Sequence, residues 1–273
     1  MLFEQSFMAL PEFLLGTPYE QYKNEGSLVM AYSMAILQEL NGRNVNNPIS
    51  CLRGEAYYSV APSRRADIRM DLDSVGVLND AMRRYCIKRH NWLEAKFFRS
   101  EDGEPVLDGT KAVHYILKDL IRLSAFPDET EDGSTSSRYL LHAYEGDPSG
   151  LVSNRRNKKE GVTQGFDRKW LTSLRAAGTQ EVDDFHLGEE TGQFDTIVGE
   201  KLRSIDLSLT VTNFCYEPCN GDDDDYYLYL TRLDSIELEF DGKKVEINGS
   251  LMTEHSENAY ESVGKSIDDA MAT

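Results

Sequence analysis

Two short segments decide the fold, Ala66-Asp67-Ile68-Arg69-Met70-Asp71-Leu72 and Trp92-Leu93-Glu94-Ala95-Lys96-Phe97-Phe98. Both place charged residues at a spacing of two among apolar ones, which is the period of a half-buried β-strand. Successive side chains of a strand point to opposite faces, so Glu94 and Lys96 share one face of the second strand. Asp67 lies on the charged face of the first. We predict two strands that each combine an apolar face with an ionisable one.

Helical and strand-like patterns extend outward from these segments. The predicted elements are, in chain order, a helix over 19–41, strands over 55–61, 66–72 and 92–98, a helix over 110–123 and a strand over 138–144. The helices rest on apolar residues three and four apart, and the strands on alternating or compact apolar runs. A short basic helix over 78–90 is expected between the second and third strands. The predicted order is therefore αβββαβ.

Beyond Gly150 the signals are weaker. We expect helices over 167–177 and 196–204, and strands over 205–214, 226–233 and 235–240. The fold class that follows is α/β, in the form of an α+β mixed sheet. Residues 1–150 are expected to form the core. Residues 151–273 are expected to form a C-terminal α+β extension that grips DNA or contacts a subunit, either separately or packed with the core as one domain.

The composition points to the cytoplasm. Of 273 residues, 40% are hydrophobic, which is enough to bury a sizeable core. The longest apolar stretch free of charge, over 28–37, is too short to cross a bilayer, and no basic segment opens the chain as in a secretory signal. Four cysteines without repeated spacing fit a reducing compartment, and Cys215 with Cys219 supplies only half of a zinc site. We expect a cytoplasmic protein with no membrane partner, whose N-terminal segment packs on the core.

The charge pattern bears on nucleic-acid binding. A formal net charge of −18 argues against bulk coating of nucleic acid, because phosphate binding rewards Lys and Arg. Basic residues nevertheless cluster, which suits one basic groove on an acidic body; solvated surface charge is the competing interpretation. The residues that we expect to contact DNA are Arg64, Arg65, Arg155, Arg156, Lys158 and Lys159. The acidic run over 222–225 is more typical of a solvated turn than of a cation site.

The charged faces of the two central strands can carry out metal chemistry. Two carboxylates, Asp67 and Glu94, can hold Mg²⁺ through oxygen ligands, and the carbonyl of Ala95 can add a further ligand. Lys96 is suited to orient a water or to stabilise charge on phosphoryl oxygens. The competing interpretation is an ordinary same-face ion pair on an edge strand. Against it, a carboxylate and an ammonium in so apolar a strand need a partner.

The pair Ala66-Asp67, followed by Glu94-Ala95-Lys96, resembles the signature of the PD-(D/E)XK, or restriction-endonuclease-like, nuclease superfamily. The core of that superfamily has the order αβββαβ, which the predicted elements of residues 19–145 also have. The resemblance implies catalytic roles for Asp67, Glu94 and Lys96, and a Mg²⁺ site that Mn²⁺ can also fill. Two departures are the alanine before Asp67 and the long insertion between the second and third strands.

An acidic residue on the first helix often assists the metal in such nucleases. Glu25 and Glu39 both fall near the apolar stripe of the predicted helix, and Glu55 on the first strand is a third candidate. We favour Glu25 because it lies at the helix start, where the stripe most easily opens into a cleft. Three histidines, at positions 90, 114 and 142, fit no catalytic spacing and are expected to be packing or surface residues.

The function implied by the resemblance is metal-dependent endonucleolytic hydrolysis of DNA, of a restriction or antiphage defence type. Because duplex cleavage needs two active sites or one used twice, we expect a homodimer, and a partner protein of the defence system is compatible with the sequence. Two alternatives remain open. One is a non-catalytic interaction protein or acidic DNA mimic on a nuclease-like fold, and the other is a DNA repair or junction-resolving nuclease.

Overall fold

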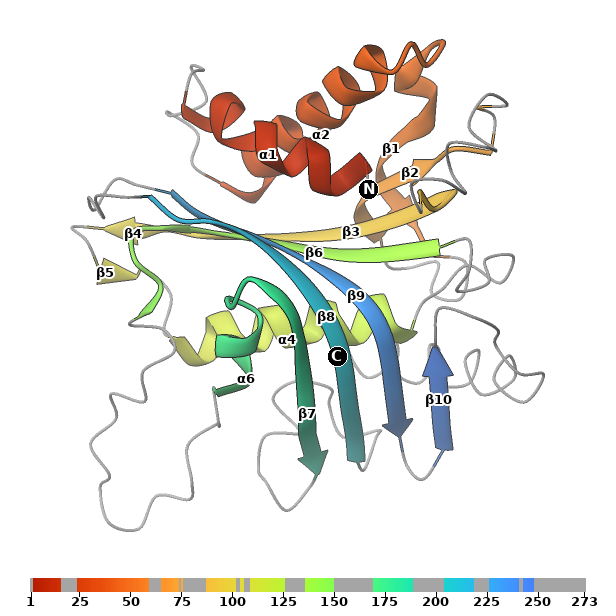
Figure 1. The fold of residues 1–273 in the computed structure, drawn as a ribbon. Helices are drawn as coiled ribbons and strands as arrows, with labels where there is room; N and C mark the ends of the chain where they lie inside the picture. The colour runs from red at the N-terminus through yellow and green to blue at the C-terminus, as the bar shows by residue number, and fades with distance from the viewer. Residues whose placement is uncertain are drawn as a thin grey trace.

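The computed structural model describes residues 2–15, 24–58, 65–73, 75, 87–101, 104–105, 109–125, 136–149, 169–188, 204–218, 226–240 and 243–247. An eight-stranded mixed sheet crosses the molecule, with helices on both of its faces (Figure 1). The predicted mixed α/β class is therefore confirmed.

The sheet is built in the order β1-β2-β3-β6-β9-β8-β7, and β10 pairs with β9 outside this path. The strands are β1 (Leu52–Tyr57), β2 (Arg65–Asp71), β3 (His90–Phe98), β6 (Ser136–Glu145), β7 (Gly178–Gly188), β8 (Ser204–Tyr216), β9 (Tyr226–Phe240) and β10 (Lys243–Ile247). β3 and β6 run parallel, whereas the other pairs in this sheet are antiparallel. A separate small sheet pairs β4 (Ser100–Glu101) with β5 (Glu104–Pro105).

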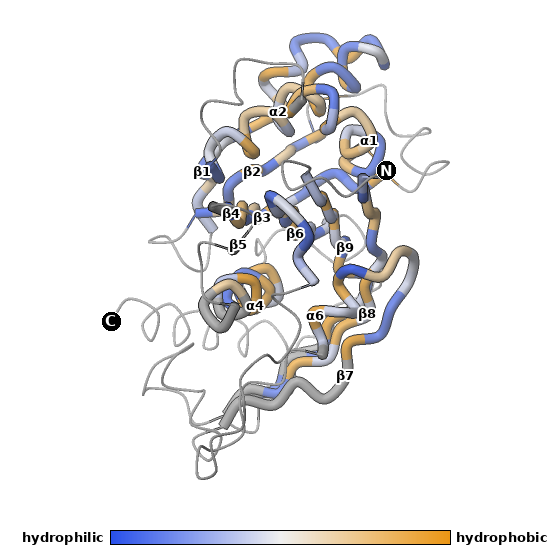
Figure 2. Tube along the Cα trace, turned by 90° about the vertical axis from the view of Figure 1, so that its left-hand side faces the viewer, coloured by the Kyte–Doolittle hydropathy of each residue, from blue (hydrophilic) through white to orange (hydrophobic). Residues whose placement is uncertain are grey.

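The helices cover opposite faces of the sheet. α1 (Leu2–Leu15) and α2 (Glu25–Gly42) lie on one face, and α4 (Gly109–Ala125) and the short α6 (Lys169–Ser173) lie on the other (Figure 1). A 3₁₀ turn, η2 (Pro48–Cys51), leads from α2 into β1. Hydrophobic positions recur along α1, α2 and α4 among hydrophilic ones (Figure 2), as expected of helices with one face on a sheet.

The core on the α1 and α2 side joins the first helices to the central strands. Phe3 and Tyr32 are fully buried and pack with Leu93 of β3 and Tyr139 of β6. Asn24 caps α2, since its side chain accepts a hydrogen bond of 3.0 Å from the backbone N–H of Ser27. The cap places the next residue, Glu25, in the first turn of α2.

β9 connects the two halves of the chain. Its N-terminal part pairs with β6, its C-terminal part pairs with β10, and β8 lies along almost its whole length. The second half of the chain thus adds its strands to the same sheet that contains β2 and β3.

Several sequence-based expectations were wrong in detail. The helix expected over 78–90 does not include residues 87–90, because His90 already begins β3; residues 76–86 lie outside the described part of the chain. Strands predicted over 226–233 and 235–240 form the single strand β9, and the helix expected over 196–204 cannot reach Ser204, which begins β8. The strands β7 and β10 were not predicted.

Candidate functional site

Asp67 lies where β2 and β3 stop pairing. The last registered pair of this antiparallel ladder is Ile68 with Leu93. Beyond it, Asp67 Oδ2 accepts a hydrogen bond of 2.7 Å from the backbone N–H of Ala95. A side-chain carboxylate thus satisfies a backbone donor on the neighbouring strand, which fixes Asp67 beside the Glu94-Ala95-Lys96 segment.

Glu94 is a buried carboxylate with two partners. Its exposed fraction is 1%, and its Oε1 accepts a hydrogen bond of 2.7 Å from the hydroxyl of Tyr58 and lies 3.7 Å from Nη1 of Arg122. Burial, and then the charge of Asp119, raises the pKa of Glu94 well above its ordinary value. The ring of Tyr58 stacks on Trp92 at 5.1 Å, which encloses Glu94 in aromatic surroundings.

Lys96 is surrounded by oxygen atoms. Its Nζ lies 3.1 Å from Glu25 Oε2 and 3.0 Å from Asp119 Oδ2, and it donates a hydrogen bond of 2.8 Å to the carbonyl of Ala95. Burial alone would lower the pKa of Lys96, but the carboxylates of Asp119, Glu25 and Asp67 outweigh it and raise that pKa. Lys96 is therefore a firmly held ammonium. One of its hydrogen bonds goes to the carbonyl of Ala95, which the sequence analysis predicted as a metal ligand.

The helix α4 contributes two residues that the sequence analysis missed. Asp119 is 1% exposed, and its Oδ1 accepts a hydrogen bond of 2.9 Å from Nη1 of Arg122. Both lie on α4 beside the buried residues Leu117, Leu120 and Ile121. An aspartate inside an apolar helical stripe was the available signal, because a buried charge needs a partner.

The three acidic candidates for the metal have different partners. Glu25, in the first turn of α2, reaches Lys96, and burial raises its pKa. Glu39 instead pairs with Arg43 at 2.8 Å, and Glu55 pairs with Arg65 at 2.6 Å. Of the three, Glu25 is the one that lies beside Lys96 and is acted on by the charges of Asp67 and Asp119.

We call this group the charged centre and define it as Glu25, Asp67, Glu94, Lys96, Asp119 and Arg122. The charge of Asp67 acts on each of the other five members. Four carboxylates meet two cationic side chains, so a formal excess of two negative charges remains when all are ionised. Its carboxylates are oxygen donors of the kind that a hard divalent cation prefers. In the described structure, however, no three of them bring their ligand atoms to within 4.8 Å of one another.

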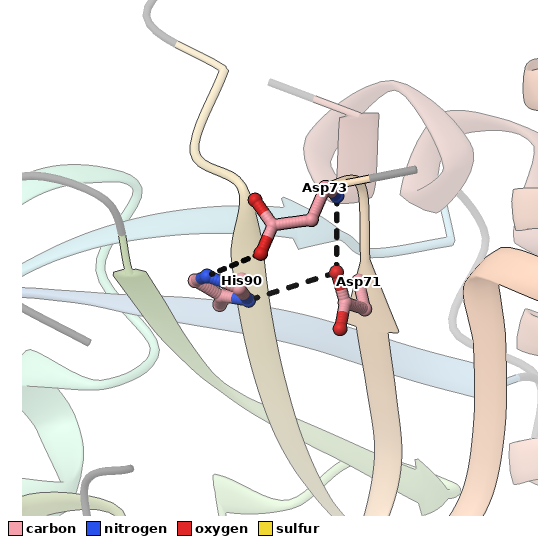
Figure 3. Close-up of side chains that lie close together, drawn as sticks. All are labelled: Asp71, Asp73 and His90. Atoms are coloured by element: carbon pink, nitrogen blue, oxygen red, sulfur yellow. Dashed lines mark hydrogen bonds and ion pairs between the residues drawn. The ribbon is translucent and has the colours of Figure 1, made fainter. Parts of the chain in front are cut away.

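A second group of ligand atoms lies at the opposite end of the same strands. Asp71, Asp73 and His90 bring one ligand atom each to within 4.8 Å of one another (Figure 3). His90 lies between the two carboxylates, with Nδ1 3.8 Å from Asp71 and Nε2 3.5 Å from Asp73. Arg69 lies 3.8 Å from the carboxylate of Asp71, and Arg89 lies 3.6 Å from that of Asp73. This group can hold a metal. Its two carboxylates face two guanidinium groups, whereas the four carboxylates of the charged centre face one guanidinium and one ammonium.

The predicted DNA contacts are only partly described. Arg65 is exposed, lies 4.5 Å above the ring of Tyr57 and donates a hydrogen bond of 2.5 Å to its hydroxyl. Five of the six residues lie outside the described part of the chain, namely Arg64, Arg155, Arg156, Lys158 and Lys159.

His142 forms part of a neutral cluster. It is fully buried in β6, its Nδ1 lies 3.0 Å from the hydroxyl of Tyr144, and its ring stacks on Tyr229 at 5.1 Å. We call these three residues the aromatic cluster. Burial, and then the charge of Arg175, lowers the pKa of His142 to about 3. His142 is therefore a packing histidine, as expected; the side chain of His114 lies outside the described set.

Among the described helices, none has the length and apolar character that crossing a membrane requires. Comparison with known proteins gives no family: no family model, no curated protein and no solved structure matches this chain.

Proposed function

We propose that this protein is a metal-dependent endonuclease that hydrolyses the phosphodiester bonds of DNA. The observation that carries the proposal is the charged centre. It gathers four carboxylates, one lysine and one arginine from α2, β2, β3 and α4 near the place where β2 and β3 stop pairing, with two negative charges in excess when all are ionised. Such an excess in a largely buried site is costly unless a cation compensates it.

The donor set fits Mg²⁺, with Mn²⁺ as a substitute. The residues that would hold it are Asp67, Glu94, Glu25 and the carbonyl of Ala95, which all supply the oxygen atoms that hard cations prefer. A bound cation of this kind polarises a scissile phosphate and lowers the pKa of a bound water.

The chain's own residues have separate tasks in this proposal. Tyr58 donates to Glu94 and fixes the orientation of its carboxylate. The backbone N–H of Ala95 does the same for Asp67. Lys96 keeps a proton on Nζ, with which it can orient an attacking water or stabilise charge on the phosphoryl oxygens.

The order of elements also supports the PD-(D/E)XK assignment that we propose. The described elements run α2, η2, β1, β2, β3, β4, β5, α4 and β6, which is similar to αβββαβ once η2 and the small β4–β5 sheet are set aside. Asp67 belongs to the second of these strands, and Glu94 and Lys96 belong to the third.

The biological setting belongs to the same proposal. A restriction or antiphage defence role, a cytoplasmic location and a homodimer that cleaves both strands fit a DNA endonuclease. Arg64 and Arg65, together with the basic residues over 155–159, are the proposed phosphate contacts. The extension over 151–273 would then help to grip the duplex or to hold a second subunit.

The test is incubation of the purified protein with supercoiled, linear and single-stranded DNA, and with RNA, in the presence of Mg²⁺, Mn²⁺ or EDTA. Nicking or linearisation of closed circles that EDTA abolishes is the expected result. Shortening from free ends alone would indicate an exonuclease. Absence of cleavage, with DNA binding retained, would support the non-catalytic alternative.

A further inference from the structure

Three oxygen atoms surround the ammonium of Lys96, and they differ in whether they can stay in contact with it when a cation binds. Two of them, Glu25 Oε2 at 3.1 Å and the Ala95 carbonyl at 2.8 Å, belong to proposed metal ligands. An oxygen that turns toward a divalent cation is a poor acceptor for an ammonium, because the two positive charges repel each other. The third, Asp119 Oδ2 at 3.0 Å, is the one that can stay with Lys96.

Asp119 is also held firmly from its other side. Its Oδ1 accepts a hydrogen bond of 2.9 Å from Arg122, which lies one turn further along α4. Its side chain is only 2% exposed, so water cannot easily replace either partner. One carboxylate oxygen of Asp119 is thus paired with Lys96 and the other with Arg122. These two contacts hold the carboxylate in place, and the carboxylate in turn holds the ammonium of Lys96.

We infer that Asp119 is the positioning residue of the charged centre: it holds the Lys96 ammonium in place when the cation takes Glu25 and the carbonyl of Ala95. This inference rests on the proposed function, and it assigns α4 a role that the strand residues alone do not provide. The role is exerted through Lys96, so loss of Asp119 should affect turnover and spare metal binding.

Asp119→Asn is the variant of choice. It keeps the size of the side chain and one oxygen acceptor, and it removes one of four carboxylates from a centre that has two negative charges in excess. The change should therefore leave the protein folded.

The main experiment is a double-mutant cycle with Asp119→Asn, Lys96→Ala and the double variant. Asp119→Asn should lower kcat for DNA cleavage by about 100-fold, while the Kd for Mn²⁺ measured by calorimetry changes by less than about threefold. The double variant should be no slower than Lys96→Ala, because the two residues act as one unit. Unchanged turnover in Asp119→Asn, or losses that multiply in the double variant, would overturn the inference. A tenfold weaker Mn²⁺ affinity would overturn it as well and would make Asp119 a ligand.

Glu4→Gln provides a matched control. Glu4 is another buried carboxylate, it pairs with Arg232 at 2.9 Å, and it lies on α1 outside the charged centre. Its replacement should lower stability without a change in turnover per folded molecule. The contrast separates a positioning role from a general loss of buried charge.

A second readout does not depend on catalysis. Acylation of Lys96 by an amine-reactive reagent, followed by mass spectrometry, should be slow in the wild type with and without Mn²⁺, and faster in Asp119→Asn only when Mn²⁺ is present. If Mn²⁺ makes Lys96 of the wild type as reactive as exposed lysines, or if Mn²⁺ does not bind, the inference is wrong. If Mn²⁺ binds and this labelling pattern holds but no nucleic acid is cleaved, the nuclease proposal fails and the role of Asp119 stands.

Discussion

The charged centre and the aromatic cluster are neighbours on the sheet, yet they respond to burial in opposite ways. The parallel register of β3 and β6 places Lys96 directly beside His142. His142 loses its charge, since its pKa falls to about 3, and it finds a neutral partner in Tyr144. Lys96 instead keeps its proton because carboxylates surround it.

This difference in protonation between His142 and Lys96 distinguishes a cluster that serves stability from one that is a candidate for function. In the aromatic cluster, His142 and Tyr144 satisfy each other as a neutral pair, and the hydroxyl of Tyr229 donates to Glu217 at the edge of the cluster. In the charged centre, burial instead raises the pKa of Glu94, Asp119 and Glu25, and the neighbouring charges act on each of them. Ionisable groups whose pKa values are shifted by burial and by specific charged partners together are candidates for a functional site.

The largest expected effect is that of Glu94→Gln. We expect cleavage to fall by about 1000-fold or more and Mn²⁺ affinity to weaken by at least about tenfold, because a buried ligand loses its charge. Thermal stability should stay the same or increase, since a repulsive carboxylate is removed. Cleavage assays, Mn²⁺ calorimetry and melting curves check this. Undiminished cleavage would remove Glu94 from the site.

The comparison also predicts how stability depends on pH. His142 has a pKa of about 3 in the folded protein and an ordinary pKa near 6.5 when unfolded. Between these values the unfolded chain binds a proton that the folded protein does not, so stability falls as the pH falls, by up to about 1.4 kcal/mol for each pH unit. Urea unfolding at pH 7 and pH 4 should show a smaller loss for His142→Phe than for the wild type. Equal losses in the two proteins would contradict the neutral state of His142.

Metal addition should distinguish the two regions directly. Mn²⁺ at about 100 times its Kd should stabilise the protein by about 2.7 kcal/mol through binding to the folded state. The gain in Tm should fall to about half or less in Glu94→Gln, disappear with EDTA and persist in His142→Phe. An undiminished gain in Glu94→Gln would point to Asp71, Asp73 and His90 as the metal site, which Asp73→Asn would then test.

The smallest expected effect lies outside both regions, at Arg65. Its exposed contacts with Glu55 and Tyr57 contribute little to stability, so Arg65→Ala should leave the free energy of unfolding nearly unchanged. If Arg65 contacts a phosphate, the slope of the logarithm of the DNA-binding constant against the logarithm of the salt concentration should become shallower by about one unit in Arg65→Ala. DNA-binding titrations of the wild type and the variant over a series of salt concentrations measure this slope. An unchanged slope would exclude a phosphate contact of Arg65.

The sequence predicted the central strands because their period of two is hardly interrupted in β2 and β3. It predicted β9 as two strands because Asp234 breaks the pattern. In the structure Thr210 pairs with Ser235 and Val211 pairs with Leu233, so Asp234 is an extra residue at an irregularity within one continuous strand. Period alone cannot distinguish such a bulge from a turn.

The candidate site was accessible to sequence reasoning only in part. Glu94 and Lys96 stand out because they interrupt an apolar strand. Asp119 and Arg122 give a weaker signal, because polar residues beside the apolar stripe of a helix are common, and the pattern does not show what they contact. Their proximity to Glu94 depends on how α4 crosses the sheet between β3 and β6, and short sequence motifs do not contain that information.

The central position of β9 has a consequence for hydrogen exchange. Because β9 is flanked by β8 on one edge and by β6 and β10 on the other, its amide protons should exchange only through global opening. β1 is an edge strand that pairs with β2 alone on the path of the sheet, so its amides should exchange through small local openings. The part of the sheet next to Asp67 can therefore open while the interior of the sheet stays closed.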